Sequence, residues 1–336
     1  MKKLTINLGV QGDKSPGEYI RIAVAAEEYG FDTIYVYDDL LYYPSFPILI
    51  TMAQHTRRIG LGACLLNGFY RHPAVVVSNY AYLHRIIGQR AALGLGRGAF
   101  FDLLGMDTSE EHTRKGFAET LGLVHHLLYG NKTPYTGEFF KSTEKAFLKV
   151  PAPEVPRIVT ATWNTHMARL AGTFGTHLQI AEVWHQDYMQ KLYDAWQEGM
   201  QESGIQAPGD FSIGGMICMG KSEREALDKA RKTVAIYLPY LQSILKNHAI
   251  DPDSALVQRI SQLSKEGKMD EAARLMPDHF VKALSLAGTP DQLAERINQL
   301  RQKVFFTGLL LSPPYGTFNS IEQNIEFIRN ELISRL

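Results

Sequence analysis

The sequence has little cysteine, no excess of either charge and no long hydrophobic run. Two cysteines among 336 residues do not make a disulfide framework, and this scarcity suits a reducing compartment. Basic and acidic residues number 35 each, which predicts no general attraction to nucleic acid or to an anionic membrane. No uninterrupted apolar stretch approaches the ~18 residues of a membrane span, and the first residues lack the apolar core of a signal peptide. The sequence therefore predicts a soluble, cytoplasmic protein that has no nucleic-acid or membrane partner.

The cysteines and histidines of the sequence also do not occur at the spacings typical of metal-binding sites. Cys64 and Cys218 each lie inside an apolar run, without further ligand types at metal-site spacing. Four histidines are too scattered for a ligand set and are interpreted as structural: His72, His166, His177 and His185. We therefore expect no metal site.

What the sequence does contain is a regular alternation of short β-rich segments with helical patterns. The expected strands are residues 4–10, 33–37, 59–66, 91–95, 157–160, 177–181, 212–219 and 307–311. The expected helices are 17–30, 47–56, 73–87, 109–128, 165–174, 186–202, 290–303 and 321–336, with one more from about Ser222. This order indicates parallel strands linked by helical crossovers, and eight units favour an α/β fold of the (β/α)8 TIM-barrel type. We expect one domain over residues 1–336, with a hairpin at 135–148 and a helical insertion at 237–287 after the seventh strand.

Active sites of such barrels lie at the carboxyl ends of the strands, and the second strand ends in two adjacent acids, Asp38 and Asp39. One interpretation is a carboxyl pair that contacts a cofactor ring or the substrate, with crowding that raises one pKa into a useful range. The other is a helix cap or an ordinary loop acid.

The third strand is rich in small residues up to Asn67, which indicates a bulge or a close backbone approach to a ligand. Just after it, Arg71 and His72 are interpreted either as ligand contacts or as an ion-pair partner and a helix cap. The fourth strand ends Gly96-Arg97-Gly98, which does not match the dinucleotide fingerprint because its third glycine is out of place. This edge can still bring backbone amides and a guanidinium to an anionic or planar ligand.

The fifth strand ends in Thr162, Trp163, Asn164 and Thr165, and a helix follows at once. Free amides at a helix N-terminus together with hydroxyl and amide side chains can bind a phosphate group. An ordinary N-cap by Asn164 or Thr165 accounts for the same residues without a ligand.

Several segments, taken together, resemble the bacterial-luciferase-like flavin and deazaflavin oxidoreductases. The resemblance covers nearly the whole chain and depends on the order of these segments: Glu27–Asp32, Ile59–Gly62, Asn67–Pro73, Gly88–Arg90, Leu93–Gly96 and Ala287–Pro290. The run from Asn67 to Pro73 most resembles the branch that uses coenzyme F420, which includes the methylenetetrahydromethanopterin reductases.

The resemblance implies that the chain is an oxidoreductase that exchanges hydride between the deazaflavin and a small organic substrate. In that branch the third strand carries a non-prolyl cis peptide bond behind the ring, and residue-by-residue mapping places it at Cys64-Leu65. The cofactor phosphate is expected near Gly96–Gly98 and Thr162–Thr165. The implied cofactor-binding residues are Asp38, Ala63, Cys64, Leu65, Asn67, Gly96, Arg97, Gly98, Thr162, Trp163, Asn164 and Thr165.

The sequence departs from its relatives at positions that matter for chemistry. Relatives often have Asp-His where this chain has Asp38-Asp39, and the sugar-phosphate dehydrogenases have glutamate where this chain has Ala99. Asp39, together with Asp38, is therefore the acid–base candidate, and Gln11 and Glu182 are secondary candidates.

Three functions remain open at this point. The first is an F420-dependent oxidoreductase, and the alternative is an FMN-dependent two-component monooxygenase; a non-catalytic ligand-binding barrel is the third. The aromatic residues expected around the substrate favour a partly apolar or planar molecule: Tyr42, Tyr43, Phe69, Trp163 and Trp184. A homodimer is expected by analogy with relatives.

Overall fold

The structure is a computed structural model that describes residues 3–98, 101–107, 109–205 and 209–336. Ala99, at which the sequence departs from the sugar-phosphate branch, lies outside the described residues. Within the described residues, no helix combines the length and the apolar character needed to cross a membrane.

The strands form a parallel sheet that closes on itself. Its strands are β1 (Thr5–Val10), β2 (Thr33–Tyr37), β3 (Gly60–Leu66), β4 (Ala91–Gly96), β7 (Ile158–Ala161), β8 (His177–Ala181), β9 (Phe211–Met219), β10 (Leu286–Gly288) and β11 (Gly308–Gly316). Their order is β10-β9-β11-β1-β2-β3-β4-β7-β8, and β8 also pairs with β9. The predicted (β/α)8 barrel is confirmed, and all eight predicted strands are found, the last of them ending five residues later than expected, at Gly316.

The helices that follow the strands begin where the sequence places capping residues. They are α1 (Pro16–Glu28), α2 (Ser45–Ala53), α3 (Pro73–Ile87), α4 (Glu110–Leu128), α5 (Thr165–Thr173), α6 (Gln186–Glu202), α7 (Glu223–Tyr237), α12 (Pro290–Arg301) and α13 (Ile321–Phe327). Ser15 and Thr289 each form a capping box, which satisfies free amides at the start of α1 and α12. The closing α-helix is shorter than predicted, because α13 ends at Phe327. The chain after it forms a π turn and then a 3-10 turn.

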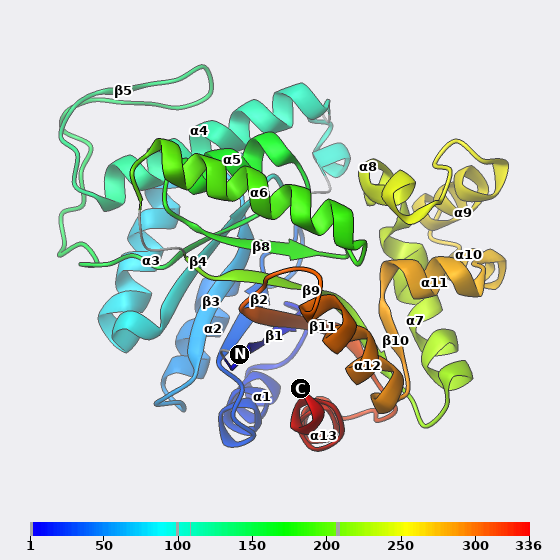
Figure 1. Cartoon of the computed structure of the whole chain (residues 1–336). Coiled ribbons are helices and arrows are strands. Elements are labelled where there is room, and N and C mark those ends of the chain that lie inside the picture. The colour runs from blue at the N-terminus through cyan, green and yellow to red at the C-terminus, as the bar shows by residue number, and fades with distance from the viewer. Residues whose placement is uncertain (1–2, 99–100, 108, 206–208) are drawn as a thin grey trace. The chain divides into compact units, whose positions relative to one another are not determined.

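The chain divides into two compact units. The first contains residues 7–179 and 194–210, and the second contains the chain up to Ile6 together with residues 180–193 and 211–336. In the first unit, β2, β3 and β4 lie side by side (Figure 1) and bury Ile34, Leu61 and Leu93 completely. The predicted hairpin is also present, as β5 (Tyr135–Thr136) paired with β6 (Lys141–Ser142).

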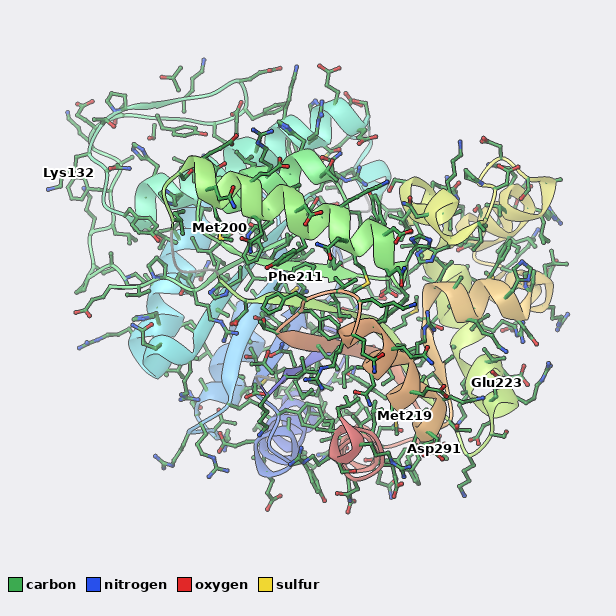
Figure 2. The ribbon with its side chains drawn as sticks, in the orientation of Figure 1. Lys132, Met200, Phe211, Met219, Glu223 and Asp291 are labelled. Atoms are coloured by element: carbon green, nitrogen blue, oxygen red, sulfur yellow. The ribbon has the colours of Figure 1, made fainter. Side chains whose placement is uncertain are left out.

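In the second unit, β9 runs from Phe211 to Met219 (Figure 2) and is buried along its whole length. The segment in which an insertion is expected contains α8 (Gln242–Leu245), α9 (Ala255–Lys265), α10 (Met269–Leu275) and α11 (Asp278–Leu284). Figure 1 shows α9, α10 and α11 gathered around α7. The sequence did not predict β10, which is only three residues long and pairs with the end of β9.

Candidate active site

The end of β3 packs directly against glycines of β4. The peptide bond Cys64-Leu65 is cis, as the resemblance predicted, and the register of β3 against β4 shifts after Ala63. A Cβ atom on Gly94 would lie 2.6 Å from the backbone oxygen of Ala63, and one on Gly96 would lie 2.6 Å from Cδ1 of Leu65. The two glycines are therefore needed for this close approach of two strands.

Asn67 connects the edges of β3 and β4. Its Oδ1 accepts hydrogen bonds from the amides of Phe69 and Tyr70, at 3.0 and 3.1 Å, which fixes the loop after β3. Its Nδ2 lies against Gly98, where an added Cβ would be 2.6 Å away. Gly98 has a φ of 85°, which favours glycine, and the neighbouring Arg97 is exposed. The predicted residues at these two strand ends thus lie together.

Asp38 is buried, and its carboxylate is fully engaged. Arg71 Nε donates to Oδ2 at 2.7 Å and Nη2 donates to Oδ1 at 3.2 Å. The amide and hydroxyl of Ser45, at the start of α2, both donate to Oδ1 at 2.8 Å. The Asp38 amide donates to the carbonyl of Cys64 at 3.2 Å, which ties the end of β2 to β3. Asp38 therefore holds its surroundings in place, and Arg71 is its ion-pair partner.

Asp39 is in a different situation, because Gln11 is the one side chain among the described residues that hydrogen-bonds to its carboxyl group. Gln11 Nε2 donates to its Oδ2 at 2.8 Å, and Gln11 Oε1 accepts from the amide of Gly12 at 2.9 Å. Burial raises the pKa of Asp39, the Gln11 hydrogen bond opposes this, and the charge of Asp38 raises the pKa further. Of the two acids, Asp39 is thus the one suited to gain and lose a proton.

The edge of β7 lies next to that of β4, because Gly96 pairs with Ala161. Beyond it, Thr162 Oγ1 accepts from the amide of Asn164 at 3.0 Å, and Asn164 Oδ1 accepts from the amide of Met167 at 3.1 Å. Asn164 is therefore the N-cap of α5. Trp163 is half-buried and Thr165 is exposed. A phosphate contact at Thr162–Thr165 stays a prediction.

His72, just after β3, has the capping role that the sequence left open, and Cys64 within β3 carries an unreactive thiol. His72 is the N-cap of α3, with Nδ1 accepting from the amide of Ala74 at 3.2 Å. Burial raises the pKa of the Cys64 thiol to about 12, so Cys64 is a neutral thiol.

Gln179 on β8 is a residue that sequence reasoning missed. The side-chain Nε2 of Gln179 lies 3.6 Å from Cys64 Sγ, and the backbone carbonyl of Gln179 accepts from the amide of Thr162 at 3.3 Å. Its Oε1 is buried and has no hydrogen-bond partner in the described part of the chain. The signal in the sequence was a single amide side chain within an apolar strand.

Glu182 belongs to the second unit and follows β8 directly. Both of its carboxyl oxygens lie within hydrogen-bond distance of the Met216 amide, at 3.0 and 3.2 Å. A Cβ on Gly215 would come within 2.5 Å of this carboxyl group. Burial raises the pKa of Glu182 to about 8, so its carboxyl is largely protonated at neutral pH.

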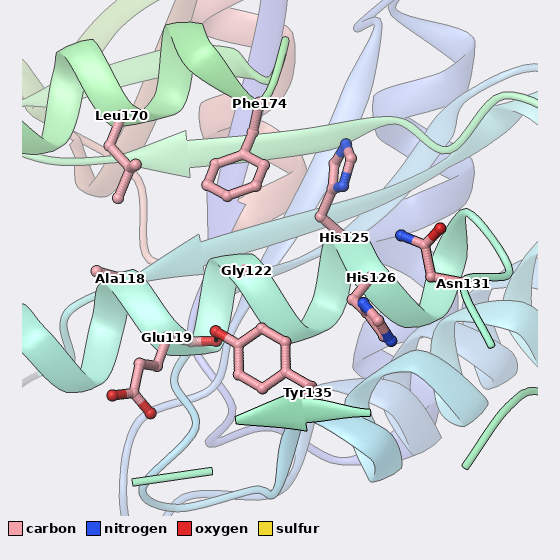
Figure 3. A pocket seen from close by; sticks show the side chains of 9 residues that line it. All are labelled: Ala118, Glu119, Gly122, His125, His126, Asn131, Tyr135, Leu170 and Phe174. Atoms are coloured by element: carbon pink, nitrogen blue, oxygen red, sulfur yellow. Dashed lines mark hydrogen bonds between the residues drawn. The ribbon is translucent and has the colours of Figure 1, made fainter. Parts of the chain in front are cut away.

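A pocket of about 460 Å³ lies away from these strand ends, between α4, α5 and the hairpin (Figure 3). Its wall includes Glu119, whose carboxylate accepts from three hairpin amides, of Glu138, Phe139 and Phe140. The pocket contains none of the predicted site residues. Across the described ranges, no group of three or more His, Cys, Asp or Glu side chains could hold a metal ion.

Comparison with protein families gives one match, to the luciferase-like monooxygenases, over residues 4–307. The chain belongs to this family. The resemblance expected from the sequence is thereby confirmed, and the chain is an oxidoreductase of the luciferase-like type.

This luciferase-like chain is similar to 5,10-methylenetetrahydromethanopterin reductases. It is 24% identical to that of Methanopyrus kandleri, covering 99% of both chains, and 26% identical to that of Archaeoglobus fulgidus, covering 95% and 94%. Among solved structures, the coenzyme F420 dependent tetrahydromethanopterin reductase from Methanopyrus kandleri matches with a TM-score of 0.83, 22% identity and 99% of both chains covered. An F420-dependent secondary alcohol dehydrogenase matches with a TM-score of 0.76 at 16% identity, again over 99% of both chains.

Proposed function

We propose that this luciferase-like oxidoreductase transfers hydride between coenzyme F420 and a small organic substrate. The observation that carries the proposal is the packing of the Ala63–Asn67 segment against Gly94, Gly96 and Gly98, near Asp39, a carboxyl whose pKa burial raises. The reductases and the alcohol dehydrogenase similar to this chain support F420 as the cofactor.

The residues present fit a flat ring with a phosphate tail. The glycines Gly94, Gly96 and Gly98 let Ala63, Leu65 and Asn67, the residues that we assign to the ring, pack closely against the end of β4. The buried Gln179 Oε1, which has no partner among the described residues, is an acceptor that a ring N–H could satisfy. We assign the ring to the Ala63–Leu65 segment and to Asn67, and the phosphate to Gly96–Gly98 and Thr162–Thr165.

When bound, coenzyme F420 supplies or accepts the hydride. The Asp39 carboxyl gives its proton to the substrate atom that becomes negative on reduction, and takes it back in the opposite direction. Gln11 orients this carboxyl through its 2.8 Å hydrogen bond. Asp38 has an indirect role, because its hydrogen bonds to Arg71 and Ser45 hold the end of β2, which Asp39 directly follows.

The loop after Asp39 favours a substrate with an apolar or planar part. Leu41, Tyr42 and Tyr43 are 85%, 47% and 62% exposed, an unusual run of large apolar side chains in contact with water. The amide of Tyr43 donates to the carbonyl of Gly12 at 2.8 Å, which anchors the loop beside the Asp39–Gln11 pair.

Cofactor binding tests the proposal directly. We expect the purified chain to bind coenzyme F420 tightly and FMN weakly, as measured by equilibrium titration of each cofactor followed by its visible absorption. Reduced F420 should then be oxidised by a suitable acceptor under anaerobic conditions. Tight binding of FMN without binding of F420 would instead favour the monooxygenase alternative.

We also propose that the chain forms a homodimer through α3. Val75, Tyr82 and Ile86 are 52%, 58% and 40% exposed and lie on one face of this helix, at spacings of seven and four residues. Light scattering after gel filtration should give twice the chain mass for the wild type. Tyr82→Glu should shift it toward the monomer, and Lys303→Glu, at an exposed polar position, should not. A wild type that is monomeric at all concentrations would contradict this assignment.

A further inference from the structure

The second unit contains a partly buried polar cluster beyond the end of β8. Its members are Trp184 from the turn after β8, His248 from the segment of the expected insertion, and Arg296 from α12. The guanidinium of Arg296 lies 5.6 Å from the centre of the Trp184 ring. The charge of Arg296 is also one cause of the lowered pKa of His248, so the three side chains are neighbours. We call them the Trp-His-Arg cluster.

Arg296 is a half-buried cation that has no carboxylate partner among the described residues. Its Nη1 donates to the carbonyls of Lys282 and Ser285, both at 2.9 Å, and no carboxylate pairs with it among the described residues. Burial lowers its pKa to about 10, so it stays protonated at neutral pH. No negative charge therefore offsets this half-buried guanidinium among the described residues, which leaves its remaining N–H groups available to an anion.

Two ring nitrogens of the cluster also lack partners. Trp184 is only 6% exposed, and its Nε1 has no hydrogen-bond partner in the described chain. The same is true of His248 Nε2. An indole N–H can only donate, and buried donors are nearly always satisfied. Trp196 shows the ordinary case, because its Nε1 donates to the Thr176 carbonyl at 2.9 Å.

The other titratable groups near the cluster supply no negative charge. Glu182, whose backbone is hydrogen-bonded to His248, carries a carboxyl with a pKa raised to about 8 by burial. The ring of His185 lies 6.5 Å from that of His248. Burial lowers the pKa of His248 to about 4, which makes it a neutral imidazole. These described groups therefore place no carboxylate charge at the cluster at neutral pH.

We propose that the Trp-His-Arg cluster binds an oxyanion, namely the carboxylate or phosphate group of a small molecule. The indole N–H of Trp184 and the remaining N–H groups of Arg296 donate to its oxygens, and the negative charge favours protonation of His248 at Nε2, which then donates as well. Because the two unpartnered nitrogens have no exposed surface, the segment that carries His248 moves aside to admit the ligand. The proposal does not depend on the redox activity of the chain.

Indole NMR of the intact, cofactor-free protein tests this proposal. The three tryptophans give three 15N-indole resonances, and Trp184→Phe identifies the one that belongs to Trp184. Titration with inorganic phosphate, and separately with acetate, should shift the Trp184 resonance with saturation. The Trp196 resonance should stay in place, because its donor is already bonded. Sodium chloride at matched ionic strength is the control for screening.

Two variants make the test decisive. Arg296→Gln should weaken phosphate binding by about tenfold or more, whereas Lys303→Gln, on the exposed surface, should bind as the wild type does. Trp184→Phe should lose most of the rise in Tm that phosphate gives the wild type. A response to phosphate alone or to acetate alone identifies which oxyanion the site takes. Absence of a saturable shift with both anions, an equal shift with chloride, or unchanged binding by folded Arg296→Gln would overturn the proposal.

Discussion

Replacing Asp39 with asparagine is expected to lower kcat by about 10²- to 10⁴-fold, the usual contribution of a positioned acid–base group. Asparagine keeps the shape of the side chain, and its oxygen can still accept the hydrogen bond that Gln11 donates to Asp39 at 2.8 Å. It cannot exchange a proton. The affinity for coenzyme F420 should therefore change little, so kcat and the cofactor Kd separate. Both are measured with an acceptor that supports turnover of the wild type.

The pH dependence gives this prediction a second readout. Burial raises the pKa of Asp39, so its carboxyl keeps the proton to a higher pH than an exposed aspartate does. In the direction of substrate reduction, the wild-type rate should fall as pH rises through this pKa, and the Asp39→Asn rate should not follow that curve. A folded Asp39→Asn protein with wild-type kcat at every pH would remove Asp39 from the mechanism.

Stability should move in the opposite direction to activity. A folded-state pKa above the unfolded value means that Asp39 favours the folded state most below the unfolded pKa and loses this contribution as pH rises through the folded pKa. Asp39→Asn should therefore raise Tm at neutral pH and have less effect in acid. Asp38→Asn is the matched control: it removes the carboxylate that holds Arg71 and Ser45, so it should lower Tm.

The different roles of Asp38 and Asp39 could not be predicted from the sequence alone. That both lie at an active-site edge follows from the strand that precedes them. Their different roles do not, because Arg71 is 33 positions from Asp38 and Gln11 is 28 positions from Asp39. Only the folded chain brings these partners together and distributes burial between the two carboxyls. The structure thus favours Asp39 over Asp38 for proton exchange.

The fold was more predictable than the site, for reasons that particular elements make clear. Alternating apolar segments and capping residues predicted eight strands, since these signals are local. The sequence placed the end of the last strand at Leu311, yet β11 runs to Gly316 through Pro313-Pro314. Prolines normally argue against a strand because they cannot donate to the ladder, and here the register shifts around them, between Ser312 and Tyr315.

Substitution of Gly94 is expected to have a large effect on cofactor binding. Replacing it with alanine should weaken coenzyme F420 binding by about ten- to a hundredfold, the equivalent of the ~1–3 kcal/mol cost of overpacking a filled core. The new Cβ would meet the backbone of β3, 2.6 Å from the Ala63 oxygen and 3.2 Å from Cys64 Cα. Backbone cannot rotate out of the way as a side chain does, so the β3 segment assigned to the cofactor ring must shift.

Gly96→Ala provides the control two residues along the same strand. Its Cβ would also meet a neighbour at 2.6 Å, but that neighbour is Cδ1 of Leu65, the end of a flexible side chain. Gly96→Ala should therefore lower Tm less than Gly94→Ala. Thermal melts compare the packing cost of the two substitutions, and the F420 titration of Gly94→Ala tests the assignment of the cofactor ring. If Gly94→Ala bound F420 as the wild type does while its Tm fell, the β3 edge would be a packing contact only, and the cofactor ring would have to be assigned elsewhere on the barrel.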